Sequence, residues 1–270
     1  SKINLEGPIV KGKTSFNISA RRSYVDLIAK PFMPNDEEYG YYFYDINAKI
    51  NHKFSDRSRI YLSVYNGKDH FAANYDGDTD SKDGSTMNWG NTIVSARWNY
   101  IFNNRLFSNT TVSYNNYLFD VNSYNNNKYA NSMGASIINR YSADYRSGIN
   151  DWSYQIDFDY NPSPIHHIKF GTGYIYHRFR PEVMTSKISE KTGDKVDRDT
   201  TYHSIANSRI YGHELSAYLE DNIKVNDRLR LNLGLHFSLF QVQKQSYSSL
   251  QPRVSARYQL GKDVTLKASY

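Results

Sequence analysis

An acidic run, Asp76 to Asp83, holds the residues best suited to bind a cation. Asp76, Asp78 and Asp80 occupy alternate positions, as carboxylates do in loops that bind hard cations such as Ca²⁺. An EF-hand loop also needs glycine at its sixth position and glutamate at its twelfth. This sequence has Ser81 and Met87 there. The run is therefore a weak Ca²⁺ candidate, and the alternative is an acidic, solvated loop.

The remaining residue types give no pattern for catalysis or for a transition metal. His166 and His167 follow a proline-containing turn, whereas His203 and His213 lie near the other ends of the expected strands, so a shared metal site is not expected. No G-x-S-x-G spacing marks a nucleophilic serine. The chain also has no cysteine, which removes thiolate chemistry. The sequence predicts a protein that is not an enzyme and has no resident cofactor.

The element that must position any functional residue here is the β-strand. Between Arg228 and Phe240 every odd position is leucine or phenylalanine, and every even position is polar or small. Side chains alternate across a strand, so one face is apolar and the other polar. The same alternation recurs along the chain and predicts about twelve strands, at 2–9, 13–23, 41–54, 58–70, 89–102, 105–121, 147–160, 166–180, 211–224, 228–242, 250–260 and 263–270.

The connections between these strands alternate in length. Turns of two to five residues at one end face long connections at the other, near 24–40, 71–88, 122–146, 181–210 and 243–249. In the first long connection, Tyr24 to Lys30 predicts about two helical turns. Outer-membrane barrels have short periplasmic turns and long extracellular loops. The pattern therefore predicts an all-β fold, a transmembrane antiparallel β-barrel wall in the bacterial outer membrane, with residues 1–270 forming part of a barrel domain.

Composition agrees with a barrel that contacts lipid. The chain has 25 Tyr among 270 residues and is 15% aromatic, which suits strands and interfacial girdles. Mean hydropathy is −0.72, and no apolar run is long enough for a membrane helix. The net charge is +6, but the basic residues are scattered over polar faces and turns. Nucleic acid is therefore not an expected partner.

Two groups of side chains are candidates for ligand contact. Tyrosines in the expected extracellular loops are suited to stacking on a sugar or a chelate: Tyr39, Tyr124, Tyr129, Tyr141 and Tyr202. Basic residues on the lumen face are suited to attract an anionic solute or to pair with carboxylates of a plug: Arg21, Lys49, Arg97, Arg230, Arg253 and Arg257. Mutual packing of the tyrosines and structural pairing of the basic residues are the alternatives.

Several short motifs occur along the chain in a characteristic order. They are Leu5-Glu6-Gly7-Pro8-Ile9, Ser15-Phe16 with Ala20-Arg21-Arg22-Ser23-Tyr24, Tyr41 to Phe54, Trp89-Gly90-Asn91, Pro162-Ser163-Pro164 with His167 to Gly171, and Leu250-Gln251-Pro252-Arg253. By the order and spacing of these motifs, rather than by any single one, the chain resembles from end to end the TonB-dependent outer-membrane receptors of Bacteroidetes-type bacteria.

The resemblance implies a plugged barrel of about 22 strands that imports a scarce nutrient with energy delivered by TonB. It further implies a plug domain, TonB and, for the glycan-importing branch, a surface lipoprotein lid as partners. Only about half of the expected strands and no plug or TonB-contacting segment are found, so we expect this chain to be part of a longer protein. The alternatives are a self-contained twelve-stranded passive porin, favoured by the aromatic terminal strand ending at Tyr270, and a surface-display scaffold.

Overall fold

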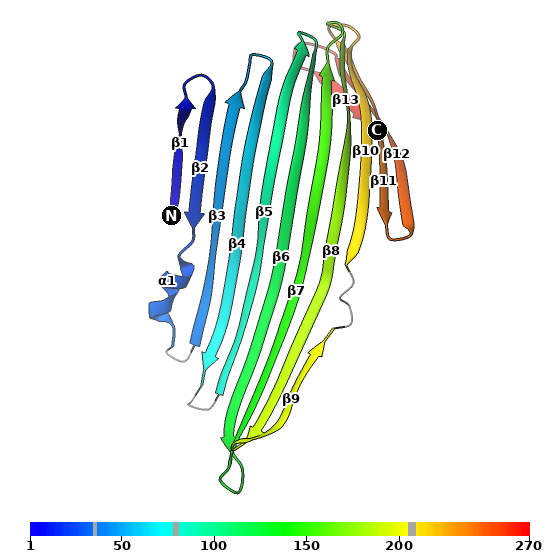
Figure 1. The fold of residues 1–270 in the computed structure, drawn as a ribbon. Helices are drawn as coiled ribbons and strands as arrows, with labels where there is room; N and C mark the ends of the chain where they lie inside the picture. The colour runs from blue at the N-terminus through cyan, green and yellow to red at the C-terminus, as the bar shows by residue number, and fades with distance from the viewer. Residues whose placement is uncertain (35–36, 78–80, 205–208) are drawn as a thin grey trace.

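The structure is a computed structural model that describes residues 1–34, 37–77, 81–204 and 209–270. Strands dominate it (Figure 1), and their bounds are β1 Lys2–Val10, β2 Thr14–Arg22, β3 Glu37–Lys53, β4 Ser58–Asp76, β5 Ser81–Asn103, β6 Leu106–Ala130, β7 Ser136–Tyr160, β8 His166–Thr192, β9 Lys195–His203, β10 Ile210–Lys224, β11 Leu229–Val242, β12 Gln245–Gln259 and β13 Thr265–Ser269. Two short helices, α1 Val25–Ala29 and η1 Lys30–Phe32, follow β2. No helix of the described residues is long and apolar enough to cross a membrane.

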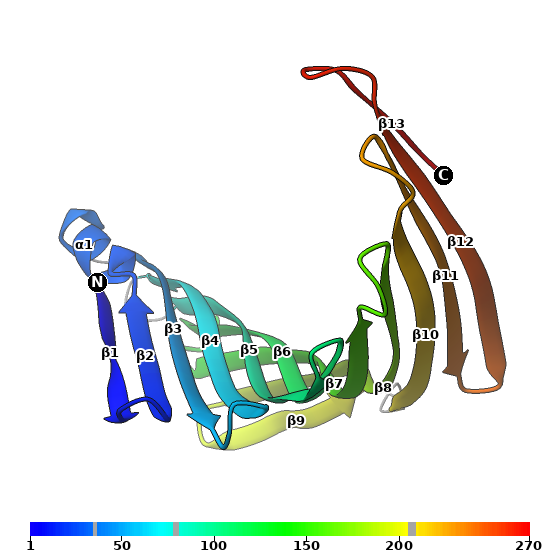
Figure 2. The same cartoon turned by 90° about the horizontal axis from the view of Figure 1, so that it is seen from above.

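All strands belong to one antiparallel sheet. Its order follows the chain from β1 to β8 and then β10 to β13, and β9 pairs with β8 beside this path. Strands that are neighbours along this path follow one another in the chain, apart from β9, as expected for antiparallel strands joined by turns. The sheet is curved into an open trough with a concave and a convex face (Figure 2). The fold class expected from the sequence, an antiparallel β-barrel wall, is therefore confirmed.

The expected strands are all present, but four of the expected loops are wrong. Residues 71–76 belong to β4 and residues 81–88 to β5; β6 and β7 fill most of 122–146, β8 and β9 most of 181–203, and β12 begins at Gln245. These segments are predominantly polar, so the regular alternation of apolar and polar residues that marks a strand is weak in them. Their backbone groups are nevertheless paired in regular ladders, which keeps them extended. In the range 24–40 the expected helical turns are confirmed by α1.

The turn that joins β6 to β7, two strands of 25 residues each, shows how the long hairpins close. Residues 131–135 connect β6 to β7, and Gly134 has φ of 80°, a left-handed conformation that glycine adopts without steric cost. The Asn131 Oδ1 atom accepts hydrogen bonds from the backbone N–H groups of Met133 and Ala135 at 3.0 and 2.9 Å. The connection expected to be a long loop is thus a five-residue turn.

The described residues contain no buried hydrophobic side chain, because a single curved layer has no second layer to cover it. Along β10, Leu215 and Leu219 are 42% and 56% exposed, whereas Ser216 and Tyr218 on the other face are half-buried. Side chains converge on a concave face and spread on a convex one. The apolar side chains therefore lie on the convex face, and the polar ones line the trough.

Candidate functional site on the concave face

The convex face has an apolar band of limited height. On β5, β7 and β8 the convex residues are apolar or aromatic from Val94 to Phe102, from Trp152 to Tyr160 and, except for Thr172, from Ile168 to Tyr176. Each stretch spans about nine residues, close to the ~9–11 that a tilted strand needs to cross a bilayer. The band begins at the short turns and ends well before the far ends of β5 to β8. The height of the band defines the membrane-spanning part of these strands.

A polar row of cross-strand partners ends this band. Asn66, Thr92, Asn116, Asn150 and Arg178 lie side by side on β4 to β8. The Asn66 Nδ2 atom donates to Thr92 Oγ1 at 2.8 Å, and the Asn150 Nδ2 atom donates to Asn116 Oδ1 at 2.5 Å. Amide pairs of this kind suit water rather than lipid, so the strands beyond this row extend out of the membrane.

At the height where the convex face changes from apolar to polar, the concave face changes from polar to aromatic. Level with the apolar band it is polar, with cross-strand pairs such as Ser63–Ser95 at 2.7 Å and Ser113–Ser153 at 2.5 Å between hydroxyl oxygens. Beyond the polar row, two successive rows of the concave face carry six aromatic side chains, which we call the aromatic wall: Tyr41, Phe43, Phe71, Trp89, Phe119 and Tyr145.

Register brings the aromatic wall together from five strands. Phe43, Trp89 and Phe119 lie on one row of cross-strand partners, and Tyr41, Phe71 and Tyr145 lie on the next. The rings of Tyr41 and Trp89 stack with centroids 6.4 Å apart, and those of Phe119 and Tyr145 meet edge to face at 5.9 Å. Such planes suit apolar or ring-shaped groups of a ligand.

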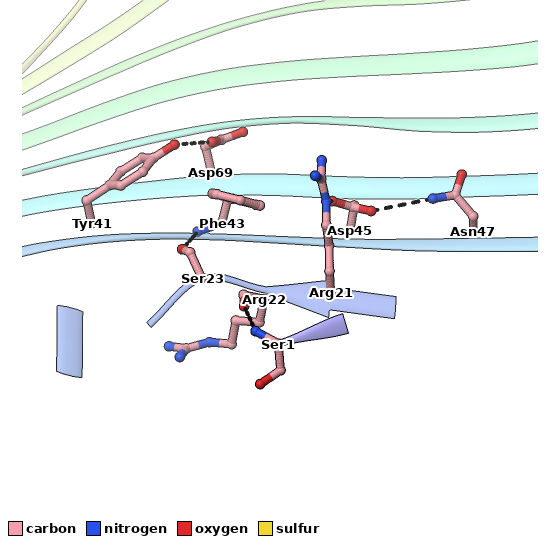
Figure 3. A network of polar contacts seen from close by, with 9 residues as sticks. All are labelled: Ser1, Arg21, Arg22, Ser23, Tyr41, Phe43, Asp45, Asn47 and Asp69. Carbon is pink, nitrogen blue, oxygen red and sulfur yellow. Dashed lines mark hydrogen bonds and ion pairs between the residues drawn. The ribbon is translucent and has the colours of Figure 1, made fainter. Parts of the chain in front are cut away.

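Polar groups at the edge of the aromatic wall are fixed by hydrogen bonds. The Tyr41 hydroxyl donates to Asp69 Oδ1 at 2.7 Å, and Figure 3 shows this phenol directed at Asp69 on the neighbouring strand. Below them, Arg21 forms an ion pair with Asp45, which is 8% exposed. The Arg21 guanidinium also lies 5.1 Å from the centre of the Phe43 ring. Arg21 therefore has an ionic partner within the sheet, and its role in attracting a solute stays a prediction.

The other predicted basic residues also lie on the concave face but do not form one cluster. Lys49 lies 5.5 Å from the centre of the Tyr61 ring, and Arg97 is a cross-strand partner of Tyr61 and Thr111. Arg230 and Arg257 are direct cross-strand partners, with Lys267 beside Arg257. They border a hollow of about 1230 Å³ near the short turns. The Arg253 Nη2 atom donates to Gln251 at 3.4 Å.

The predicted tyrosines are divided between the two faces. Tyr39, Tyr129 and Tyr141 share the concave face beyond the aromatic wall. Tyr202 on β9 pairs with Ser186 on that same face. Tyr124 lies on the convex face, because its partners are Gly84 and Ser142, and it therefore cannot join the other four. Their role in ligand contact stays a prediction.

The calcium prediction falls partly on residues outside the described ones, namely Asp78 and Asp80. Asp76 forms an ion pair with Lys82, with 3.0 Å between carboxylate oxygen and Nζ. Among the residues that the structure describes, no three His, Cys, Asp or Glu side chains are grouped so that they could hold a metal ion. His166 and His167 point to opposite faces: His166 contacts Asp221 at 2.7 Å and His167 contacts Asp159 at 2.9 Å.

Fold and surface together define a class of protein. A strictly antiparallel curved sheet, an apolar convex band of membrane height and a polar trough are the features of an outer-membrane β-barrel wall. Residues 22–270 match the family described as TonB dependent receptor-like, beta-barrel. The chain belongs to this family of outer-membrane receptor barrels, whose members are transport proteins rather than enzymes. No curated protein matches the sequence significantly.

Solved structures with the same fold are distant in sequence. The ferric preacinetobactin receptor BauA from Acinetobacter baumannii is 10% identical with a TM-score of 0.65, over 99% of this chain and 44% of that one. The ferripyoverdine receptor of Pseudomonas aeruginosa is 12% identical with a TM-score of 0.62, over 99% and 39%. The RagAB peptide transporter is 8% identical with a TM-score of 0.61, over 95% and 33%. This chain thus spans less than half the length of these proteins.

The aromatic wall is the part of the site that the sequence did not reveal. Phe71, Trp89, Phe119 and Tyr145 fell in or beside segments expected to be loops, so no face was assigned to most of them. A signal was present, since Tyr41 and Phe43, and likewise Tyr117 and Phe119, stand two residues apart and so share one face of a strand. The residues between them, Tyr42 and Leu118, are not polar, so alternation did not separate this face from the other.

Proposed function

We propose that this chain forms part of the wall of an outer-membrane receptor that imports a scarce nutrient with energy from TonB. The observation that carries the proposal is the reversal of polarity at one height. The wall faces lipid with apolar residues below the Asn66–Arg178 row, and it faces its own interior with aromatic residues above that row. An aromatic interior surface outside the membrane suits capture of a ligand before it enters the lumen.

The two parts of the concave face suit different occupants. The lower part is lined with hydroxyl, amide and ionic pairs, which suits contact with a polar plug domain of the same protein. The upper part carries the aromatic wall, which suits rings of an organic ligand, such as a sugar, a peptide side chain or a metal chelate. A Bacteroidetes-type receptor with a surface lipoprotein lid remains the finer proposal, and the sequence motifs and the similarity in fold to the RagAB peptide transporter support it.

The proposal is tested with the full-length protein in cells that depend on it for uptake. Radiolabelled ferric siderophores, oligosaccharides and peptides are offered as probes, with and without a functional TonB. We expect uptake of one probe class, and loss of that uptake when TonB is inactive. Uptake that continues unchanged without TonB would contradict active import and would favour the passive porin.

Two variants then locate the ligand. Trp89→Ala removes the centre of the aromatic wall and is expected to weaken binding about 5- to 30-fold, the equivalent of about 1–2 kcal/mol for a stacked aromatic contact. Tyr124→Ala removes an aromatic ring from the convex face, five residues further along β6 than Phe119, the cross-strand partner of Trp89, and is the control. Equal losses in both variants, at equal amounts of protein in the membrane, would show that the aromatic wall is not the binding surface.

A further inference from the structure

Three arginines gather on the convex face directly above the apolar band. Arg178 and Arg180 follow Tyr176, the last aromatic residue of the band on β8, and they share its face. Arg209 precedes Ile210, which pairs with Phe179, so continuing this register by one residue places Arg209 opposite Arg180. A strand advances about 7 Å over two residues, so the guanidinium groups lie within the first layer outside the hydrocarbon.

These arginines lack a counter-charge among the residues that the structure describes. Arg180 donates to the neutral amide oxygen of Asn150 at 3.3 Å and lies over Gly148, where a side chain would meet its Nη2 atom. The Nε atoms of Arg178 and Arg180 have no hydrogen-bond partner. By contrast, Arg21 and Arg22 on β2 pair with Asp45 and Asp26. Two convex carboxylates among the described side chains, Asp120 and Asp144, lie on rows further out and accept hydrogen bonds from asparagines.

Aromatic side chains lie beside and immediately below the arginines, since Tyr211 is the cross-strand partner of Arg178 and Tyr176 lies two residues before Arg178 on the same face. Tyr176 and Tyr211 stack with nearly parallel rings 6.1 Å apart, and the Tyr174 hydroxyl hydrogen-bonds to His213 Nδ1 at 2.7 Å. Aromatic rings with one polar edge mark the boundary between hydrocarbon and headgroups. The site therefore offers an apolar surface for acyl chains and, one step higher, unpaired guanidinium groups for a bidentate anion.

We propose that Arg178, Arg180 and Arg209 bind the phosphate group of a membrane lipid in the leaflet on the side of the long strands. A lipid fits better than a free anion because the convex face continues downward as a lipid-facing surface, so one molecule contacts both the arginines and the aromatic residues below them. This assignment uses the convex face and does not depend on the ligand of the concave face.

The test is native mass spectrometry of the full-length protein purified in detergent, with bis-phosphorylated lipid A as the probe and dephosphorylated lipid A as its control. We expect retention of the phosphorylated lipid only. Arg178→Gln/Arg180→Gln is expected to weaken that retention about 30-fold, from about 1 kcal/mol for each arginine near a charged surface. Arg178→Lys/Arg180→Lys keeps the charge but loses the bidentate geometry, so a smaller loss is expected.

Matched controls separate a site from general charge attraction. Lys68 lies on the same face and on the same row as Arg180, but on β4, and it is exposed. Lys68→Gln is expected to leave lipid retention within about twofold of the parent protein, as befits a single exposed charge. An equal loss of lipid retention in Lys68→Gln, or retention of the dephosphorylated lipid, would overturn the assignment. Complete displacement of the lipid by about 10 mM inorganic phosphate would overturn it too, because weak anion sites fill at that concentration.

Discussion

Gly171 on β8 occupies a position where the packing of the trough leaves no room for a side chain. A Cβ atom there would lie 2.6 Å from the backbone oxygen of Ile156 and 2.8 Å from both Asp157 Oδ1 and Tyr218 Cε1. Over this glycine the Tyr218 hydroxyl donates to Asp157 at 2.8 Å, which links β10 to β7 across β8. We therefore predict that Gly171→Ala destabilises the barrel and breaks this link.

The expected magnitude follows from opposing contributions. Overpacking against a backbone oxygen that cannot rotate away costs about 1–3 kcal/mol, and loss of the Tyr218–Asp157 hydrogen bond adds about 1 kcal/mol. Replacing glycine also restricts the unfolded chain, which restores about 0.4–1 kcal/mol. The net loss is about 2 kcal/mol in the free energy of unfolding, or roughly 30-fold in the folding equilibrium.

Urea unfolding of the full-length protein in lipid vesicles, followed by tryptophan fluorescence, measures this loss. Gly234→Ala is the matched control, because Gly234 on β11 lies on the concave face, as Gly171 on β8 does. A Cβ atom at Gly234 would meet only ordinary contacts at 3.4 to 3.7 Å. We expect the control to unfold at or slightly above the urea concentration of the parent protein. If Gly171→Ala unfolds at the same concentration as Gly234→Ala, the reasoning from the close approach at β8 is refuted.

Two further predictions concern ionic groups. Asp45→Asn removes the partner of Arg21, and because Arg21 is itself 56% exposed we expect a loss of only about 1 kcal/mol in the same unfolding assay; an unchanged urea midpoint would show that this pair contributes nothing. In the turn after β10, Lys224 lowers the pKa of the Asp227 carboxyl below its ordinary value through a hydrogen bond and charge attraction. A lowered pKa stabilises the fold above the ordinary value and loses that effect as the pH falls through the folded pKa. Asp227→Asn should thus unfold slightly earlier than the parent at pH 7 and equally at about pH 2, whereas a difference that persists in acid would contradict the assignment.

The sequence predicted the strands best where lipid constrains them. In the apolar band each strand must place hydrophobic residues outward at every second position. The alternation in Leu229 to Leu239 and in Trp152 to Tyr160 therefore predicted which side chains face lipid. Beyond the band both faces contact water and the selection for alternation ends. That is why 71–88 and 122–146 were predicted as loops although they are largely strand.

Face assignment beyond the band also depends on a local irregularity. Between Arg146 and Gly148 the pairing of β7 with β8 shifts, because β8 has one residue more than β7 there. Even-numbered residues of β8 lie on the convex face before this bulge, as Arg178 and Arg180 do. After it Met184 faces Tyr145 on the concave side. A bulge reverses the parity of every later residue, and counting along the sequence alone does not reveal it.

The sequence by itself determined the fold class, the order of the strands, the short turns and the direction of the side chains within the membrane, because these follow from local alternation. Only the tertiary structure decided which residues become neighbours. The aromatic wall draws on β3 to β7, Tyr124 is separated from the other predicted tyrosines, and Arg180 lies over Gly148 opposite Arg209. The physical reason is that register is set by the pairing of whole strands, so each of these contacts depends on residues far away in the sequence.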